Sequence, residues 1–164
     1  GLRTGEIDGL PWKNVDFQRR QIIINQAIVN GEIGATKTQG SNRLVQMNQL
    51  VYDALLAQKT ISYGKSEFVF CSKNGSSLNH RNITKRVWYP LLRYLELEKR
   101  NPYQTRHTCA TLWLAAGESP EWIASQLGHS SSKMLFTVYS RFVPNLTRQD
   151  GSALDKVLKE KGLL

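Results

Sequence analysis

The chain has 164 residues, of which 40% are hydrophobic and 21% are charged, a balance that excludes a disordered or fibrous protein. Its length suits a single domain with several helices and a small sheet. Lys and Arg number 22 against 13 Asp and Glu, and the resulting formal charge of +9 favours a polyanionic partner.

Cysteine and histidine spacing predicts neither a metal site nor a disulfide framework. Cys71 and Cys109 lie far apart with no CxxC pattern, so reduced thiols are the simpler interpretation, although one disulfide stays open. His80, His107 and His129 are too widely spaced for a zinc pattern. No apolar run reaches membrane-spanning length and no signal peptide is present, so we expect a cytoplasmic protein.

The first residues predict the end of a helix over residues 2–9, which stops at Gly9. Because Gly1-Leu2-Arg3 offers no capping residue, we expect a fragment that has lost an upstream part. Arg3 and Glu6 are three residues apart and share a helical face, so Glu6 is placed to orient the Arg3 guanidinium. The alternative is an exposed ion pair that contributes little.

A strand-rich segment follows. β-Branched residues predict strands at 14–17, 21–25 and 27–29, and Asn30-Gly31 predicts a tight turn, together an antiparallel meander. Two further strands, 35–38 and 43–47, flank a polar tip. This places Lys37 near a hairpin loop, where its long side chain either reaches a ligand or is an ordinary solvated charge.

Two helices are predicted next. Asn48 caps the first, which runs to about Lys59 with Val51, Leu55 and Leu56 buried. Asn79 caps the second, and Pro90 predicts a kink or a break within it.

The second of these helices has two distinct faces. Its apolar residues recur every four positions and predict a core-facing stripe: Ile83, Val87, Leu91 and Leu95. Its polar face carries His80, Arg81, Lys85 and Arg86, a basic stripe that follows a nucleic-acid backbone or is simply solvated.

The last third of the chain reads as four helices. Residues 103–116 form one, closed by Gly117, with Arg106 near its start and Cys109, Trp113 and Ala116 inward. Ser119-Pro120 starts the next, which ends at Gly128 and leaves His129 on a turn. A third helix presents Tyr139 at its far end, and a fourth, residues 150–160, is amphipathic.

Five motifs, in this order, resemble the catalytic domain of the tyrosine recombinase (phage integrase) family over nearly the whole chain. They are Gly1-Leu2-Arg3-Thr4-Gly5-Glu6 with Leu10-Pro11-Trp12, Thr36-Lys37-Thr38 with Arg43-Leu44-Val45, Thr105-Arg106-His107-Thr108 with Ala110-Thr111, Leu127-Gly128-His129-Ser130, and Tyr139. The resemblance implies an α+β fold, mostly helical with a small antiparallel sheet. It also implies that residues 1–164 are a catalytic domain whose N-terminal core-binding domain is absent.

The same resemblance implies a site-specific DNA recombinase that works through a 3′-phosphotyrosyl intermediate without metal or other cofactor. Tyr139 is then the nucleophile, while Arg3 and Arg106 clamp the scissile phosphate. His129 hydrogen-bonds a non-bridging oxygen, and Lys37 is the general acid that protonates the leaving 5′-oxygen.

The chain departs from the family pattern at Tyr103, because the family generally has a histidine three residues before the second arginine. A phenol still makes hydrogen bonds, so Tyr103 stays among the expected catalytic residues. It accepts a proton poorly at neutral pH, which leaves the assignment of a general base open. We expect His107 to be a packed residue hydrogen-bonded to backbone, and Trp88, Trp113 and Trp122 to be core residues.

The resemblance implies double-stranded DNA as partner, a homotetramer of full-length chains on DNA, accessory host DNA-bending factors, no membrane, and a nucleoid-associated location. Residues 150–160 dock on their own domain or on a neighbouring protomer, and the sequence leaves both open. Two alternatives remain: a catalytically impaired DNA-binding remnant of a mobile element, and a type IB topoisomerase-like strand-passage enzyme.

Overall fold

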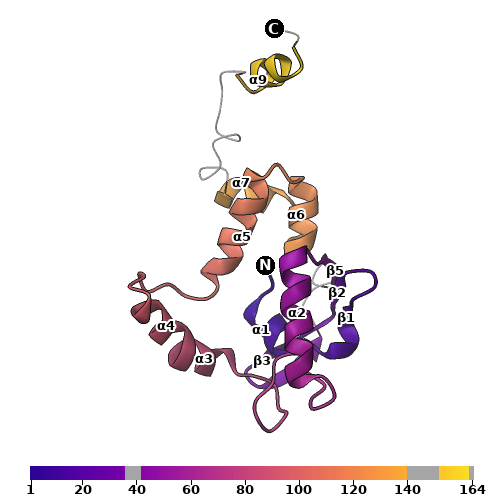
Figure 1. The fold of residues 1–164 in the computed structure, drawn as a ribbon, viewed down its shortest axis with the longest axis vertical. Coiled ribbons are helices and arrows are strands. Elements are labelled where there is room, and N and C mark those ends of the chain that lie inside the picture. The colour runs from indigo at the N-terminus through magenta and orange to yellow at the C-terminus, as the bar shows by residue number, and fades with distance from the viewer. Residues whose placement is uncertain (36–41, 140–151, 163–164) are drawn as a thin grey trace.

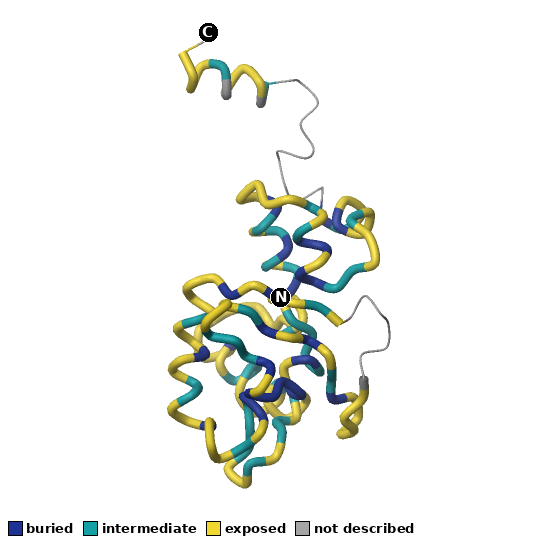
Figure 2. The backbone as a smooth tube through the Cα atoms, turned by 90° about the vertical axis from the view of Figure 1, so that its right-hand side faces the viewer, coloured by how far each residue is buried: buried dark blue, intermediate teal, exposed yellow. Residues whose placement is uncertain are grey.

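The computed structural model describes residues 1–35, 42–139 and 152–162. Figure 1 shows a sheet lobe (residues 1–35 and 42–78), a helical lobe (residues 103–139), and a helical arm (residues 79–94) at the side of the sheet lobe. Buried backbone gathers separately in the sheet lobe and in the helical lobe (Figure 2). The predicted α+β fold, mostly helical with a small antiparallel sheet, is confirmed.

Helix α1 (Thr4–Asp8) is shorter than predicted and is capped. Arg3 is the extended N-cap residue, and its backbone N–H donates to Glu6 Oε2 at 2.8 Å. The expectation that Gly1-Leu2-Arg3 lies inside an uncapped helix is therefore wrong, because the third residue of the helix supplies the missing cap. The predicted stop at Gly9 is confirmed.

The strands form two small antiparallel units. One is a three-stranded sheet in the order β1 (Val15–Asp16), β2 (Gln21–Ile24), β5 (Arg43–Gln46). The other is a hairpin of β3 (Gln26–Val29) and β4 (Glu32–Ala35) around the predicted turn, where Asn30 and Gly31 have φ of 55° and 88°.

The predicted meander is wrong at one point, because β2 pairs with β5 and not with β3. The Ile22↔Val45 register places these side chains, with Ile24, in one core. The predicted pairing of strands adjacent in the sequence did not take this burial into account. Ala35 is the last residue of β4. The predicted strand residues 36–38, including Lys37, lie outside the described residues.

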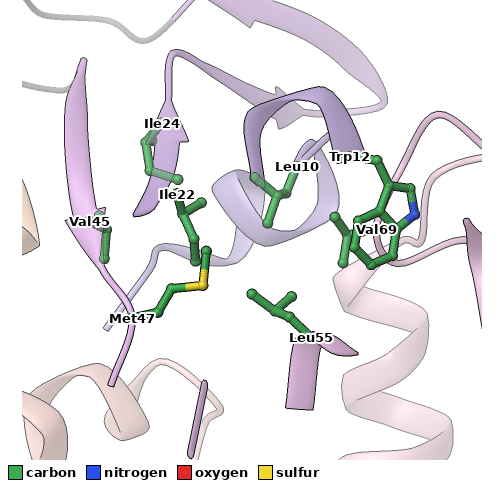
Figure 3. Close-up of a cluster of buried hydrophobic side chains, with 8 residues drawn as sticks. All are labelled: Leu10, Trp12, Ile22, Ile24, Val45, Met47, Leu55 and Val69. Carbon is green, nitrogen blue, oxygen red and sulfur yellow. The ribbon is translucent and has the colours of Figure 1, made fainter. Parts of the chain in front are cut away.

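The core of the sheet lobe lies between β2, β5 and α2 (Gln49–Ser62). The short helix η1 (Trp12–Asn14), which comes before β1 in the chain, adds Trp12 to it. Figure 3 shows its buried side chains pointing toward one another: Leu10, Trp12, Ile22, Ile24, Val45, Met47, Leu55 and Val69.

Helix α2 begins as predicted, with the Asn48 side chain accepting from Val51 N at 3.0 Å. Leu55 is buried, but Val51 and Leu56 are 36% and 40% exposed, so that part of the predicted stripe is wrong. The inward face instead includes Ser62, which is fully buried and whose hydroxyl donates to Val69 O at 2.6 Å.

The arm is a continuous helix of α3 (His80–Ile83), the π-helical turn η3 (Thr84–Trp88) and α4 (Tyr89–Tyr94). The Asn79 cap is confirmed, since its side chain accepts from Arg81 N. Of the predicted kink or break at Pro90, the break does not occur. The helix continues through the proline, which lacks an N–H, and the irregularity is the wider π turn that ends at Trp88, two residues before it.

The core stripe predicted on the arm is wrong. Ile83, Val87, Leu91 and Leu95 are 38–53% exposed, and Leu92 is buried in their place. The four-residue period does put these side chains on one face, but that face is exposed. Figure 1 shows the arm beside the sheet lobe. Trp88 is half-buried, and its indole N–H donates to Arg100 O at 2.6 Å.

The helical lobe packs α5 (Gln104–Ala115), α6 (Pro120–Leu127) and α7 (Lys133–Tyr139) around a second core. Its buried residues are Ala110, Leu114, Ile123, Ala124, Leu127, Leu135 and Tyr139. Trp113 and Trp122 are half-buried against it, edge to face at 5.2 Å.

One inward residue predicted for α5 is wrong, because Ala116 is exposed and already lies past the helix. The Ser119 cap and the Gly128 stop are confirmed. Helix α9 (Ser152–Glu160) lies apart from both lobes with Leu154 63% exposed (Figures 1 and 2). Within the described ranges, no helix has both the length and the apolar character needed to cross a membrane.

Candidate active site

Four predicted site residues gather where the two lobes meet. Arg3 precedes α1, Arg106 lies in the first turn of α5, His129 follows α6, and Tyr139 ends α7. Arg106 hydrogen-bonds His129, and the charges of the arginines act on the pKa values of His129 and Tyr139. Lys37, the predicted general acid, lies outside the described residues, and Tyr103, the sixth predicted residue, is described with His107 below.

A buried carboxylate organises the first arginine. Glu6 Oε1 accepts from Arg3 Nη1 at 2.9 Å, which confirms that Glu6 orients Arg3 and replaces the alternative of an exposed, weak pair. Burial alone would raise the pKa of Glu6, but hydrogen bonds from Arg43 and from the Arg3 backbone outweigh it and hold the pKa below its ordinary value. Glu6 is therefore an anion wherever the domain is folded near neutral pH.

Arg43 is a candidate site residue to which the motifs assigned no role. Its guanidinium forms a two-pronged ion pair with Glu6, at 2.9 Å to Oε1 and 2.8 Å to Oε2, and its Nε donates to Gln126 O at 2.8 Å. The pair is nearly inaccessible to solvent. In the sequence Arg43 is recognisable as the first residue of a predicted strand. Its spacing from Glu6 does not predict that the two side chains form an ion pair.

In the turn after α6, the backbone of Gly128 packs closely against Arg3 and Arg43. Arg3 Nη2 donates to Gly128 O at 3.0 Å, and Gly128 adopts φ +66°. A Cβ on Gly128 would lie 2.9 Å from Arg43 Nη1. Glycine is thus required both by the backbone conformation and by the arginine packed against it.

Arg106 is buried, with 2% exposure, and joins the lobes. Its Nη1 donates to Gly1 O and its Nη2 to Leu127 O. Burial, and then the neighbouring positive charge of Arg3, lower the pKa of Arg106. Its Nη2 also lies 3.1 Å from His129 Nε2.

His129 is held neutral. Burial, followed by the charges of Arg106 and Arg3, lowers its pKa to about 4. Its Nε2 faces a guanidinium N–H and therefore accepts, so the ring hydrogen belongs on Nδ1. Nδ1 is buried and has no hydrogen-bond partner among the described residues. The ring thus offers a dry, unused N–H donor beside two arginines.

Tyr139 is 3% exposed, and its hydroxyl lies 2.6 Å from His107 Nδ1. Burial raises its pKa, while the nearby charge of Arg106 acts in the opposite direction. The interpretation of His107 as a residue bonded to backbone is wrong, since its ring bonds the Tyr139 hydroxyl. The sequence did contain an indication that His107 lies near the site, because it is four residues after Tyr103, on the same face of α5.

Tyr103, the position that departs from the family pattern, is the N-cap residue of α5 and is 40% exposed. Its ring meets His107 edge to face at 5.3 Å. The structure therefore brings Tyr103 to the site through His107. In the described part of the chain, no group of three or more His, Cys, Asp or Glu is arranged to hold a metal ion.

Known proteins share this fold. The solved Tn1549 transposon integrase, in complex with circular intermediate DNA, is 25% identical with a TM-score of 0.77, covering 96% of this chain and 55% of its own. The Phage integrase family model matches residues 1–144, so the chain belongs to the phage integrase family.

Curated relatives agree with this assignment. Prophage integrase IntR of Escherichia coli K12 is 27% identical over 179 residues, covering 94% of this chain and 44% of its own length. The putative defective protein IntQ of the same strain is 27% identical over 186 residues, covering 98% and 47%. The chain thus spans about half the length of the curated relatives it matches.

Proposed function

We propose that this chain is the catalytic domain of a site-specific DNA recombinase, which cleaves and rejoins strands through a 3′-phosphotyrosyl intermediate. The observation that carries the proposal is the convergence of Arg3, Arg106, His129 and Tyr139 from four separate segments on one place between the lobes. Family membership supports the same chemistry. Because the relatives are about twice as long, we also propose that an N-terminal core-binding domain completes the protein.

Each side chain has a role that its surroundings suit. The Tyr139 hydroxyl attacks the scissile phosphate, and Arg3 and Arg106 stabilise the charge that builds on the non-bridging oxygens. The unpartnered Nδ1–H of His129 donates to one of those oxygens. Lys37 protonates the leaving 5′-oxygen, because an alkoxide leaves poorly without a proton.

DNA binding must rearrange this site. Arg106 and Tyr139 are almost fully buried, and the Arg106 donors are engaged by the carbonyls of Gly1 and Leu127. A phosphate that takes either of these two N–H bonds has to displace the carbonyl that now accepts it. The described state is then a closed one, and substrate assembles the cleavage geometry.

The proposed partner is double-stranded DNA. The formal charge of +9 favours it, and the related Tn1549 integrase has been solved with DNA. Assembly of four full-length chains on paired sites, with host DNA-bending factors, completes the proposal. The exposed arginines and lysines of the arm, Arg81, Lys85 and Arg86, are available to phosphates of the duplex.

A suicide duplex tests the proposal. The full-length protein is incubated with its recombination site carrying a nick beside the scissile phosphate, and covalent complex is resolved on a denaturing gel. Wild-type protein is expected to trap and Tyr139→Phe to bind without trapping.

Two results would contradict this proposal. If both proteins bind the site and neither traps, the chain is a DNA-binding remnant. If the protein relaxes supercoiled plasmid that lacks any recombination site, the result favours the topoisomerase-like alternative over a site-specific recombinase.

A further inference from the structure

We propose that His107 accepts the proton of Tyr139 during strand cleavage, and so fills the role that Tyr103 leaves vacant. The inference rests on the proposed function, since it requires Tyr139 to be the nucleophile. It adds a catalytic residue, because His107 touches the reacting atom.

The geometry is direct. His107 Nδ1 lies 2.6 Å from the Tyr139 hydroxyl, within the range at which a base takes a proton. The two rings are 5.6 Å apart between centroids and tilted by 47°. In the tautomer that carries its hydrogen on Nε2, the Nδ1 lone pair accepts the phenol O–H.

The other imidazoles are engaged elsewhere. All three histidines of the chain fall within the described residues. His80 lies on the arm, where its Nδ1 pairs with Asp8 at 2.6 Å. His129 uses Nε2 to accept from Arg106, and its Nδ1 is the donor reserved for phosphate. His107 is the imidazole that contacts the nucleophile.

Helical geometry explains how one residue replaces another. Tyr103 and His107 are four residues apart, so both lie on the face of α5 that meets the end of α7. A base moved by one helical turn can therefore serve the same hydroxyl. Tyr103 keeps a supporting place with its ring edge against His107.

The proton and electron pairs balance over a full exchange. As the phenol oxygen forms its bond to phosphorus, the O–H bond breaks and its proton passes to His107 Nδ1. The bond from phosphorus to the 5′-oxygen breaks, and that oxygen takes a proton from the general acid. In the second step an incoming 5′-hydroxyl attacks phosphorus and gives its proton back to the general acid. The bond from phosphorus to the Tyr139 oxygen breaks, and the departing phenolate recovers the proton from His107.

A cavity beside His107 and Tyr139 is large enough to admit a small molecule. A cavity of about 550 Å³ borders His107 and Tyr139, and Gln104, Thr108 and Thr111 of α5 contribute to its wall. Removal of the imidazole would enlarge this space without disturbing the buried arginines. Added imidazole therefore has a route to the vacated position.

Three variants of the full-length protein test the inference in single-turnover trapping on the nicked duplex. His107→Ala is expected to slow trapping roughly 10²- to 10⁴-fold, the usual contribution of a positioned base. His107→Asn is expected to be slow too, because its amide replaces Nδ1 as a hydrogen-bonding group but does not accept a proton. Glu118→Ala, at an exposed position past the end of α5 and away from the cavity, is the control and should trap at the wild-type rate.

Two further measurements separate proton transfer from positioning. Imidazole should restore trapping to His107→Ala in proportion to its concentration, and leave Tyr139→Phe inactive. A duplex with sulfur in place of the bridging 5′-oxygen has a leaving group that needs no proton. It should rescue Lys37→Ala but not His107→Ala, and thermal unfolding confirms that each variant is folded.

The outcomes are distinguishable. If wild-type protein fails to trap, the proposed function falls and the role of His107 falls with it. If wild type traps while His107→Asn keeps its rate, or if the sulfur duplex rescues His107→Ala, the function stands and His107 is not the base.

Discussion

At the scale of single residues, two arginines share one carboxylate and a third lies close by. Glu6 binds Arg3 and Arg43 together, and Arg106 is held by carbonyls of both lobes. Glu6 thereby fixes the direction of Arg3 before any phosphate arrives. A guanidinium positioned in advance stabilises a transition state without reorganising as the reaction proceeds.

This arrangement predicts that Arg3→Ala separates cleavage from binding. Cleavage should fall about 10²- to 10³-fold, because the clamp acts where charge develops, whereas DNA affinity loses one phosphate contact among several and falls far less. Trapping rates and fluorescence-anisotropy titrations measure the two effects. Arg19→Ala, at an exposed ion pair with Asp16, is the control. Equal losses of cleavage and binding would remove Arg3 from the active site.

The neutral state of His129 predicts a pH dependence of stability. The pKa of its ring is about 4 in the folded protein, against 6.5 as the ordinary value. Between these two values the unfolded chain binds a proton that the folded chain does not, so the free energy of unfolding should fall as the pH falls from about 6.5 to 4. The pKa of Glu6, lowered on folding, extends the loss to more acid pH.

Urea unfolding at a series of pH values measures this effect. His129→Gln cannot take up the proton, so its free energy of unfolding should vary less than that of wild type between pH 6.5 and 4. An identical slope in the two proteins would show that some other group causes it.

At the scale of elements, the turn between α6 and α7 is the point where helix geometry and site geometry meet. Gln126, near the end of α6, accepts from Gln46 N at 2.7 Å and donates to Leu44 O at 3.3 Å, so the helix end is fastened to β5. The same turn then presents Gly128 to Arg3 and His129 to Arg106. Docking of α6 on the sheet is what aligns the two lobes.

Two glycines give a matched test of that turn. Gly128 and Gly117 both follow helices with positive φ, but nothing lies within 4 Å of a Cβ on Gly117. Gly117→Ala should cost about 1–2 kcal/mol from backbone conformation alone. Gly128→Ala should cost more, because Arg43 must also move. Chemical denaturation measures both, and equal costs would contradict the close approach.

The arm shows how an element can be identified correctly and its packing predicted wrongly. It is anchored at its start, where the backbone N–H and Nδ1 of His80 both bond the buried Asp8 Oδ2. Its capping residue was readable from sequence, as was the periodicity of Ile83, Val87, Leu91 and Leu95. Periodicity reports which side chains share a face, and it carries no information about what covers that face.

At the scale of the whole molecule, the site belongs to neither lobe alone. Arg106 of the helical lobe bonds Gly1 O, and Arg3 of the sheet lobe bonds Gly128 O, so each lobe supplies an arginine to the other. Any movement that opens the lobes would separate Arg3 from Arg106. The proposed binding of a duplex and the assembly of the candidate site are therefore expected to be coupled.

The net charge predicts strong salt dependence of DNA binding. Each phosphate neutralised by Lys or Arg releases counterions, so the logarithm of the association constant should fall linearly with the logarithm of salt, with a slope near −0.9 for every contact. Titrations between about 50 and 200 mM salt measure the slope. An affinity unchanged over this range would exclude a phosphate-dominated interface.

The sequence by itself determined where most helices and turns begin and end, and it predicted the candidate site residues. Caps at Asn48, Asn79 and Ser119, the Asn30-Gly31 turn and the stop at Gly128 are local, because each depends on backbone groups within a few residues. The residues Arg3, Arg106, His129 and Tyr139 came from motifs in order along the chain.

Tertiary structure alone decided which distant groups meet. The pairing of β2 with β5, the ion pair of Glu6 with Arg43 and the contact of His107 with Tyr139 join residues 19 or more positions apart. Such contacts form because the lobes pack and exclude water, and no local preference of the chain records them. For this reason the sequence indicated the chemistry, while the structure indicated which imidazole serves the tyrosine.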